Sequence, residues 1–401
     1  MRSETEFSAA AGKRRLPGVI NLLAIAGGFV AANSHFSQPL LPSIGASFGQ
    51  SPALMGALPA ITQLGLAVGL LAVLPLYDLF ERRRAIVATL LLLAVAAAIH
   101  ALSPTLGFLW ISAFFVGLGC CAAQLMTPYA ALLAPPGREG EASSRVLSGV
   151  LVGVLLSRMV AGAVEQLAGW RMLYGGSSVC LLLVAAVVAR RGVISRNREA
   201  MSYGMLMASL GRMIVTMPRL RRHAMNGAIT FGMLMAFWGT YAMHVQSAYG
   251  LGPLATGLIG IVGIAGATGA SFAGRLVDGG RFRQTQLLAG WLMLVGFGLM
   301  ALPLRNLPLL CLAVLLIDLA GGLSHAANQS SAFRLAPEAR GRINSVYMVA
   351  YFLGGALSVS LSSLLYLAAG WSAICLYAMA LALILQAFEL LRPAQRLEAR
   401  G

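Results

Sequence analysis

Long apolar runs separated by short polar joins are the dominant pattern along this chain of 401 residues. Most runs have the roughly 20 residues that a helix needs to cross about 30 Å of hydrocarbon. Several joins are only a few residues long, so consecutive helices are expected to run antiparallel. The pattern predicts an all-α integral membrane protein with twelve transmembrane helices. Their ranges are Pro17–Leu41, Leu54–Tyr77, Ala85–Leu102, Leu106–Ala134, Val146–Leu167, Met172–Ala189, Ala224–Gln246, Ala255–Val277, Thr285–Leu304, Leu307–Ala336, Ile343–Leu367 and Ser372–Leu390.

The second half of the chain repeats landmarks of the first half in the same order and at nearly constant spacing. The matched pairs are Gly49 with Gly250, Pro52 with Pro253, Gly56 with Gly257, Asp78 with Asp278, Pro135 with Pro337, and Trp170 with Trp371. Chance matches would scatter in register, so the pattern indicates a duplication. It predicts two pseudo-symmetric six-helix bundles, residues 1–189 and 223–401, joined by a cytoplasmic linker at residues 190–222. Many secondary transporters build a central, alternately exposed site between two such halves.

Basic residues of the loops fall almost entirely on one side of the predicted membrane, and only Arg171 and Arg305 belong to the other side. The positive-inside rule therefore predicts a multi-pass protein of the cell inner (plasma) membrane with both termini in the cytoplasm. Within the linker, apolar residues between Tyr203 and Val215 recur at helical spacing. They predict a short helix on the membrane surface, with a flexible linker as the alternative.

The composition narrows the class of protein further. Apolar residues make up 58% of the chain and charged residues 10%, whereas soluble domains average about a quarter charged. The net charge of +16 comes from short clusters between apolar runs, so the sequence does not predict nucleic-acid binding. The chain has no Gly-x-x-x-x-Gly-Lys loop for ATP, and its predicted spans contain no clustered metal or nucleophile motif. We expect no enzyme activity, cofactor or metal, and the duplication argues against a passive channel made of repeated subunits.

The second predicted cytoplasmic hairpin carries a recognisable motif. Residues 74–83 resemble the Gly-x-Leu-x-Asp-Arg-x-Gly-Arg-Arg signature of the major facilitator superfamily, and residues 274–278 resemble its opening a second time. The matching positions are Leu76, Asp78, Arg82 and Arg83; Leu74 and Glu81 replace glycines of the signature, and Leu79 replaces an arginine. The resemblance implies the major facilitator fold.

Two further segments, residues 38–42 and residues 351–356, resemble bacterial efflux permeases of the drug–proton antiporter and arabinose-efflux type. One feature departs from that pattern. The fourth helix has no arginine near Gly117, where many such antiporters have one, and this puts a proton relay in that helix in doubt.

The resemblance also implies a gate at the hairpin. Asp78 can face the positive N-terminus of a helix in the opposite bundle, and Arg82 and Arg83 can pair with acids there. Asp278 occupies the equivalent place in the second half. These residues are expected to form a latch that holds in one conformation and breaks in the other. The alternative is that the charges only set the topology.

Two ionisable residues lie near the middle of predicted spans, Arg158 in the fifth and Asp318 in the tenth. Placing a charge at such depth costs about 2.5–3.5 kcal/mol on insertion scales, so each of these residues is expected to have a functional or structural role. We predict that Asp318 is the proton-coupling carboxylate and that His325, on the same helix face, assists it. Arg158 is expected to act in gating. A fixed Arg158–Asp318 ion pair is the structural alternative. Glu165 and Glu389, near helix ends, are expected to reach water.

In the family that the chain resembles, helices 1, 4, 7 and 10 line the central cavity, and polar residues gather on those helices here. They are Asn33, His35 and Gln38 in helix 1, Gln124 in helix 4, Trp238, Tyr241 and His244 in helix 7, and Asn328 and Gln329 in helix 10. The alternative for any one of them is an interhelical hydrogen bond worth about 0.6 kcal/mol. Helix 8 has a glycine at every third position from Gly257 to Gly269 and is expected to face helix 5.

Together these features predict a secondary active transporter that exports a small amphipathic or metabolite-like solute by alternating access, coupled to protons. The alternative is a proton symporter that imports a sugar, an amino acid or an organic acid. The expected partners are the solute, protons and the lipid bilayer, and we expect a monomer.

Overall fold

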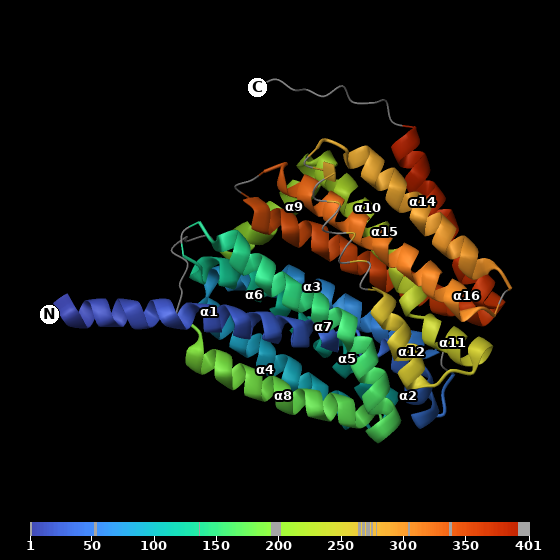
Figure 1. The fold of residues 1–401 in the computed structure, drawn as a ribbon, viewed down its shortest axis with the longest axis horizontal. Helices are drawn as coiled ribbons and strands as arrows, with labels where there is room; N and C mark the ends of the chain where they lie inside the picture. Colours follow the sequence, from blue (N-terminus) through green and yellow to red (C-terminus); the bar gives the residue numbers. More distant parts are fainter. Residues whose placement is uncertain are drawn as a thin grey trace. The chain divides into compact units, whose positions relative to one another are not determined.

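The computed structural model describes residues 2–51, 54–135, 137–193, 202–263, 266, 269, 273, 276–277, 279–303, 305–336 and 339–391; of these, the side chains of residues 2–17, Pro75 and Asp78 are outside the description. Every regular element within these ranges is a helix (Figure 1). The chain divides into two compact units. The first contains Met1–Arg212 and Gly250–Ile261, and the second contains Met213–Tyr249 and Val262–Gly401.

The first unit is built from long helices that pack pairwise, α1 against α7, α3 against α5 and α4 against α8 (Figure 1). The first predicted span is interrupted before Pro39 and Pro42, and the fourth is interrupted at Cys121. The elements are α1 (Arg2–Asn33), η1 (Gln38–Leu40), α2 (Leu41–Ser47), η2 (Leu54–Gly56), α3 (Ala57–Leu79), α4 (Arg82–Ala101), α5 (Leu106–Cys120), α6 (Ala122–Leu133), α7 (Glu139–Ala168), α8 (Trp170–Arg191) and α12 (Pro253–Ile259). The linker helix α9 (Tyr203–Thr216) is present as predicted, and its place on a membrane surface remains a prediction.

The second unit also packs pairwise, with α10 against the first part of α16 as α1 packs against α7, and with α14 against both α15 and α16. The seventh predicted span is divided at Gly239 and Thr240. The elements are α10 (Pro218–Trp238), α11 (Tyr241–Tyr249), α14 (Phe282–Ala301), α15 (Leu307–Phe333) and α16 (Arg340–Leu390), with η3 (Gly260–Gly263) following α12. Gly370, at φ 72°, breaks α16 between the predicted eleventh and twelfth spans.

The backbone supports the duplication that the sequence indicates. Gly169 and Gly370, which precede the matched Trp170 and Trp371, have φ values of 82° and 72°. Gly49 and Gly250, another matched pair, have φ values of 61° and 66°. Residues with side chains rarely adopt this left-handed conformation, so glycine is the residue that these chain reversals require. Both halves therefore turn at the same places and by the same means.

Ten helices in the described part of the chain are long and apolar enough to cross a membrane. One of them, α16, contains two predicted spans. The shorter apolar helix Pro253–Gly263 begins the eighth predicted span. The all-α membrane architecture predicted from the sequence is confirmed. The division into bundles at residues 189 and 223 remains a prediction.

Glycines bring several helix backbones into direct contact. A Cβ atom on Gly117 of α5 would lie 1.9 Å from the Thr62 carbonyl oxygen of α3, and one on Gly153 of α7 would lie 2.0 Å from the Gly28 carbonyl oxygen of α1. Such contacts are typical of membrane helices, where small residues allow close van der Waals packing. These glycines therefore set the spacing of the helices in the first unit.

The glycine series of helix 8 faces two neighbours. The expected contact with helix 5 is present, because a Cβ on Gly257 would lie 2.3 Å from the Arg158 carbonyl oxygen of α7. Gly269 instead meets α15, where a Cβ would lie 2.5 Å from the Leu319 carbonyl oxygen. Gly257 therefore faces helix 5 as expected, and Gly269 faces a second helix for a geometric reason. A helix turns about 100° per residue, so every third position falls back by about 60° and the series winds around the helix.

We expect Gly117→Ala to destabilise the protein by about 1–3 kcal/mol, the usual cost of overpacking, because α3 and α5 must move apart. Gly176→Ala in α8 is the matched control, since no atom lies within 4 Å of a Cβ at Gly176. Thermal unfolding of the two purified variants in the same detergent measures the difference. Equal melting temperatures would contradict the backbone contact at Gly117.

Candidate functional site

A buried carboxyl group lies at the middle of the second unit's helices. Asp318 of α15 is 9% exposed. Its Oδ1 accepts a hydrogen bond of 3.2 Å from Trp238 Nε1. Trp238 is the last residue of α10, immediately before the break between α10 and α11. The structure thus brings together two predicted site residues from helices 7 and 10.

Aromatic rings surround this pair. The Trp238 ring lies 4.8 Å from the Phe237 ring and 4.8 Å from the Tyr241 ring, both measured between centroids and both near perpendicular. Trp238 and Tyr241 are almost fully buried. The site therefore combines one ionisable group with a wall of flat apolar surfaces. Burial makes the charged form of a carboxyl group costly, and this property suits an acid that takes up and releases a proton.

His325 lies seven residues after Asp318 on α15, as predicted, and its ring contacts α16. His325 Nδ1 is 3.1 Å from the Tyr347 hydroxyl. The Tyr351 ring lies 4.6 Å from the His325 ring, and the Phe231 ring stacks on Tyr351 at 4.0 Å. His325 thus belongs to a second aromatic cluster, which α15 forms with α16 and α10, and its assisting role remains a prediction.

In the first unit, Arg158 of α7 is also buried, at 4% exposed. Its Nε donates a hydrogen bond of 2.9 Å to Gln38 Oε1 of η1. A Cβ on Gly260 would lie 2.9 Å from the Arg158 Cβ. The structure therefore joins two predicted site residues and packs the start of helix 8 over them. Arg158 belongs to the first unit and Asp318 to the second, and their pairing remains a hypothesis.

The other predicted residues of helices 1 and 4 have local partners or a partly exposed position. Asn33 donates to the Phe29 carbonyl at 2.8 Å and accepts from the Ser177 hydroxyl of α8 at 2.7 Å. This is the interhelical hydrogen bond that the sequence left open as the alternative. The His35 Nδ1 lies 2.8 Å from the Ser34 hydroxyl in the turn after α1. Gln124 is half-buried on α6.

The predicted polar residues near the C-terminal end of helix 10 also bond between helices. Asn328 Oδ1 lies 3.1 Å from His223 Nδ1 of α10, and its amide nitrogen donates to the Ser324 carbonyl at 2.9 Å. Gln329 donates to Asn344 Oδ1 of α16 at 3.0 Å. These bonds join α15 to α10 and to α16.

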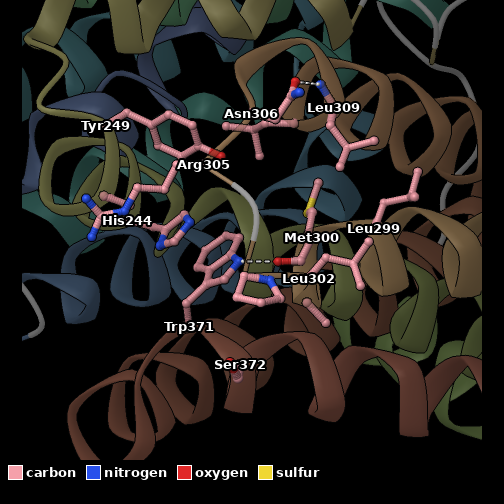
Figure 2. Close-up of a pocket in the computed structure, with 14 residues that line it drawn as sticks. His244, Tyr249, Leu299, Met300, Leu302, Arg305, Asn306, Leu309, Trp371 and Ser372 are labelled. Carbon is pink, nitrogen blue, oxygen red and sulfur yellow. Dashed lines mark hydrogen bonds between the residues drawn. The ribbon is translucent and has the colours of Figure 1, made fainter.

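His244 lies in a different place from the other helix 7 residues. Its ring stacks on the Trp371 ring at 4.0 Å with an angle of 7° between the planes. Both rings line a cavity of about 330 Å³ at the end of the second unit where α11, the α14–α15 connection and the kink of α16 meet (Figure 2). The sequence predicted His244 as part of the central cavity, and the structure places it in this pocket.

The hairpin signature is described in part. The side chain of Asp78 and the whole of Asp278 lie outside the described residues. Arg83 Nη1 donates to the carbonyl oxygens of Ala189 and Gly192, at 3.2 and 3.3 Å, and so ties the hairpin to the end of α8. The guanidinium of Arg82 lies 5.5 Å from the centre of the Tyr77 ring. A latch at this hairpin remains a prediction.

Sequence reasoning missed a buried ion pair in the second unit. Glu389 is 3% exposed. Its Oε1 accepts from Arg222 Nη2 at 2.7 Å and from Asn226 Nδ2 at 3.3 Å. The expectation that Glu389 reaches water was wrong, because the start of α10 covers the end of α16. Arg222 was assigned to the linker, but α10 begins at Pro218, six residues before the predicted start at Ala224, and therefore includes this cation.

Comparisons with known proteins agree with this architecture. A family model described as Major Facilitator Superfamily matches residues 23–359. The chain is 34% identical over 369 residues to the uncharacterized transporter YgaY of Escherichia coli O157:H7, a match that covers 92% of this chain and 94% of YgaY. It is 28% identical over 333 residues to the chloramphenicol resistance protein of Streptomyces lividans, covering 81% of this chain and 82% of that protein.

A solved structure supports the fold. The crystal structure of a bacterial homolog of the human lysosomal transporter Spinster, inward-facing and unoccupied, matches with a TM-score of 0.74. The match covers 94% of this chain and 96% of that chain, at 13% sequence identity. At such identity the likeness shows a shared fold and carries no information about the solute.

Proposed function

The chain belongs to the Major Facilitator Superfamily of membrane transporters, and from this premise we propose that it exports a small amphipathic solute in exchange for protons. Transport of a small-molecule solute without enzymatic chemistry follows from the family. Proton coupling and the outward direction are the steps that we add. Asp318 is the proposed proton carrier, and the aromatic wall beside it is the proposed contact surface for the solute.

The hydrogen bond from Trp238 to Asp318 is the observation that carries this proposal. A protonated Asp318 and a charged Asp318 can both accept this bond, so one geometry serves both halves of a transport cycle. The rings of Phe237 and Tyr241 pack against Trp238, and aromatic rings of this kind suit contacts with aromatic and amphipathic solutes. A carboxylate at this place also disfavours anionic solutes.

The relative from Streptomyces lividans supports export, because its name describes resistance to chloramphenicol. Chloramphenicol is a neutral, aromatic, amphipathic molecule, and this chemistry fits the surroundings of Asp318. It is therefore the first solute that we would test. We further propose that the protein is a monomer in the cell inner membrane, with both termini in the cytoplasm, as the distribution of arginines predicts.

Accumulation of labelled chloramphenicol in vesicles that contain the purified protein tests the proposal, with a panel of other amphipathic solutes beside it. An acidic lumen is expected to drive accumulation, because protons that leave exchange for solute that enters. Accumulation driven by an acidic exterior would instead indicate symport. Transport that ignores the pH gradient in both directions would contradict proton coupling.

We expect Arg158→Gln to lower the transport rate about tenfold while the protein remains folded, because a charge-assisted hydrogen bond is worth about 1.5–3 kcal/mol. A glutamine can still donate to Gln38, so the local packing is preserved. Arg145→Gln, on an exposed face of the same helix, is the matched control. Loss of folding in Arg158→Gln would favour a structural role, and an unchanged transport rate would exclude a role in gating.

A further inference from the structure

The cavity beside Trp371 is separate from the proposed proton site and has the features of a ligand pocket. Its volume of about 330 Å³ is at the lower end of the range of small-molecule sites. It lies at the end of α14 and the beginning of α15, whereas Arg283 and the Arg222–Glu389 pair mark the opposite end of this unit. Figure 2 shows the aromatic and basic side chains that line it.

Two stacked rings form a flat wall of the pocket. The His244 and Trp371 rings are parallel within 7° and 4.0 Å apart. The indole is held in place because Trp371 Nε1 donates a hydrogen bond of 3.0 Å to the Met300 carbonyl (Figure 2). The Tyr249 ring stands nearly perpendicular to His244 at 6.0 Å. A planar ligand would meet a surface that is already ordered, which lowers the entropic cost of binding.

The charge of the pocket is positive. Arg305 contributes an exposed guanidinium to the lining, and none of the lining residues that the structure describes is Asp or Glu. The Asn306 side chain is engaged in the capping of α15, where it accepts from the Leu309 backbone N–H at 3.0 Å (Figure 2). The guanidinium is therefore the group in this pocket best suited to recognise charge, and it selects for anions such as carboxylates.

In the first half of the chain, a side chain of the protein itself occupies the place that is equivalent to this pocket. Trp170 is the counterpart of Trp371. The Arg171 guanidinium lies 4.4 Å from the centre of the Trp170 ring and donates to the carbonyls of Ala101 and Ser103, at 2.8 and 3.1 Å. In the second half the next residue is Ser372, which is exposed and too short to reach across. The planar Arg171 side chain thus covers Trp170, whereas the equivalent place beside Trp371 is an open pocket.

We propose that this pocket binds small planar organic anions, with the ring of the ligand against the His244–Trp371 wall and its carboxylate against Arg305. The site is distinct from the surroundings of Asp318, and the proposal is independent of the direction of transport. Packed aromatic rings connect this pocket to the surroundings of Asp318. The Trp371 ring lies 6.0 Å from the Phe237 ring, and Phe237 contacts Trp238.

Equilibrium dialysis of the full-length purified protein with labelled benzoate and labelled benzamide tests the proposal. The two probes have nearly the same shape and differ in charge. Benzoate is expected to bind at least about tenfold more tightly than benzamide, since each 1.4 kcal/mol of a charged contact is a factor of ten. Arg305→Gln should reduce the affinity for benzoate to that for benzamide, while Arg281→Gln, an exposed arginine in the loop before α14, should leave both affinities unchanged.

Ser372→Arg provides a second, independent arm. It recreates the arrangement of Trp170 and Arg171 and should abolish benzoate binding in a protein that melts at the temperature of the wild type. Asp318→Asn should leave benzoate binding unchanged, which separates this pocket from the proposed proton site. Equal binding of benzoate and benzamide would overturn the proposal. So would benzoate binding that survives both Arg305→Gln and Ser372→Arg, or that is lost in Asp318→Asn.

Discussion

Asp318→Asn is expected to abolish the accumulation of solute driven by a pH gradient and to preserve the exchange of labelled for unlabelled solute across the same vesicles. The amide oxygen of asparagine can still accept the hydrogen bond from Trp238, so the site keeps its shape. Asparagine cannot carry a proton, so the step that links proton movement to solute movement is lost. Exchange requires only that the loaded protein alternate between its two openings.

Glu389→Gln is the matched control for this prediction, because Glu389 is the other acid of the second unit that is almost fully buried in the described residues. Its glutamine can still accept from Arg222 and Asn226, and accumulation driven by the gradient should persist. Undiminished accumulation in Asp318→Asn would remove Asp318 from the coupling role. Loss of accumulation and exchange together would point to a role in solute binding.

Arg222→Ala is expected to destabilise the protein by about 3–5 kcal/mol, because removal of one partner leaves the other charge buried without compensation. Glu389 has an exposed side-chain fraction of only 4%, and that of Arg222 is 26%, so solvent screens the pair weakly. The pair joins the beginning of α10 to the last turn of α16, and its loss should loosen that end of the unit. Thermal unfolding in detergent measures the effect.

Arg219→Ala is the control for Arg222→Ala, because Arg219 lies one turn earlier on α10 and is exposed. Its melting temperature should equal that of the wild type. The double variant Arg222→Met with Glu389→Leu should recover most of the stability, since a well-packed apolar pair can replace a buried ion pair. Equal melting temperatures of Arg222→Ala and Arg219→Ala would show that the ion pair contributes nothing.

The sequence predicted the features that the order of residues along the chain determines without knowledge of contacts between helices. The apolar runs predicted the helices, the matched landmarks predicted a duplication that the left-handed glycines Gly169 and Gly370 support, and the position of Asp318 within a run predicted its burial. The family and the general function, transport without enzymatic chemistry, are likewise confirmed. These features follow from local spacing and hydrophobicity, which a single chain displays directly.

The sequence could not predict which residues pair between helices, because these pairs depend on how each helix is rotated about its axis and where it breaks. The bond from Trp238 to Asp318 joins α10 to α15, and two runs of apolar residues do not reveal which of their faces meet. The pair of Arg222 and Glu389 joins residues at opposite ends of the second half. His244 was assigned to the central cavity because helix 7 lines that cavity in the family that the chain resembles; the structure places it on α11, where it lines the pocket beside Trp371.

The movement of protons during solute transport tests the central claim most directly. Solute is added to weakly buffered vesicles that enclose a pH-sensitive dye, in the absence of an imposed gradient. With the wild-type protein, entry of solute should make the lumen more alkaline, because protons leave in exchange, and Asp318→Asn should show solute entry without a change in pH. Solute entry without proton movement in the wild type, or equal proton movement in Asp318→Asn, would contradict the account.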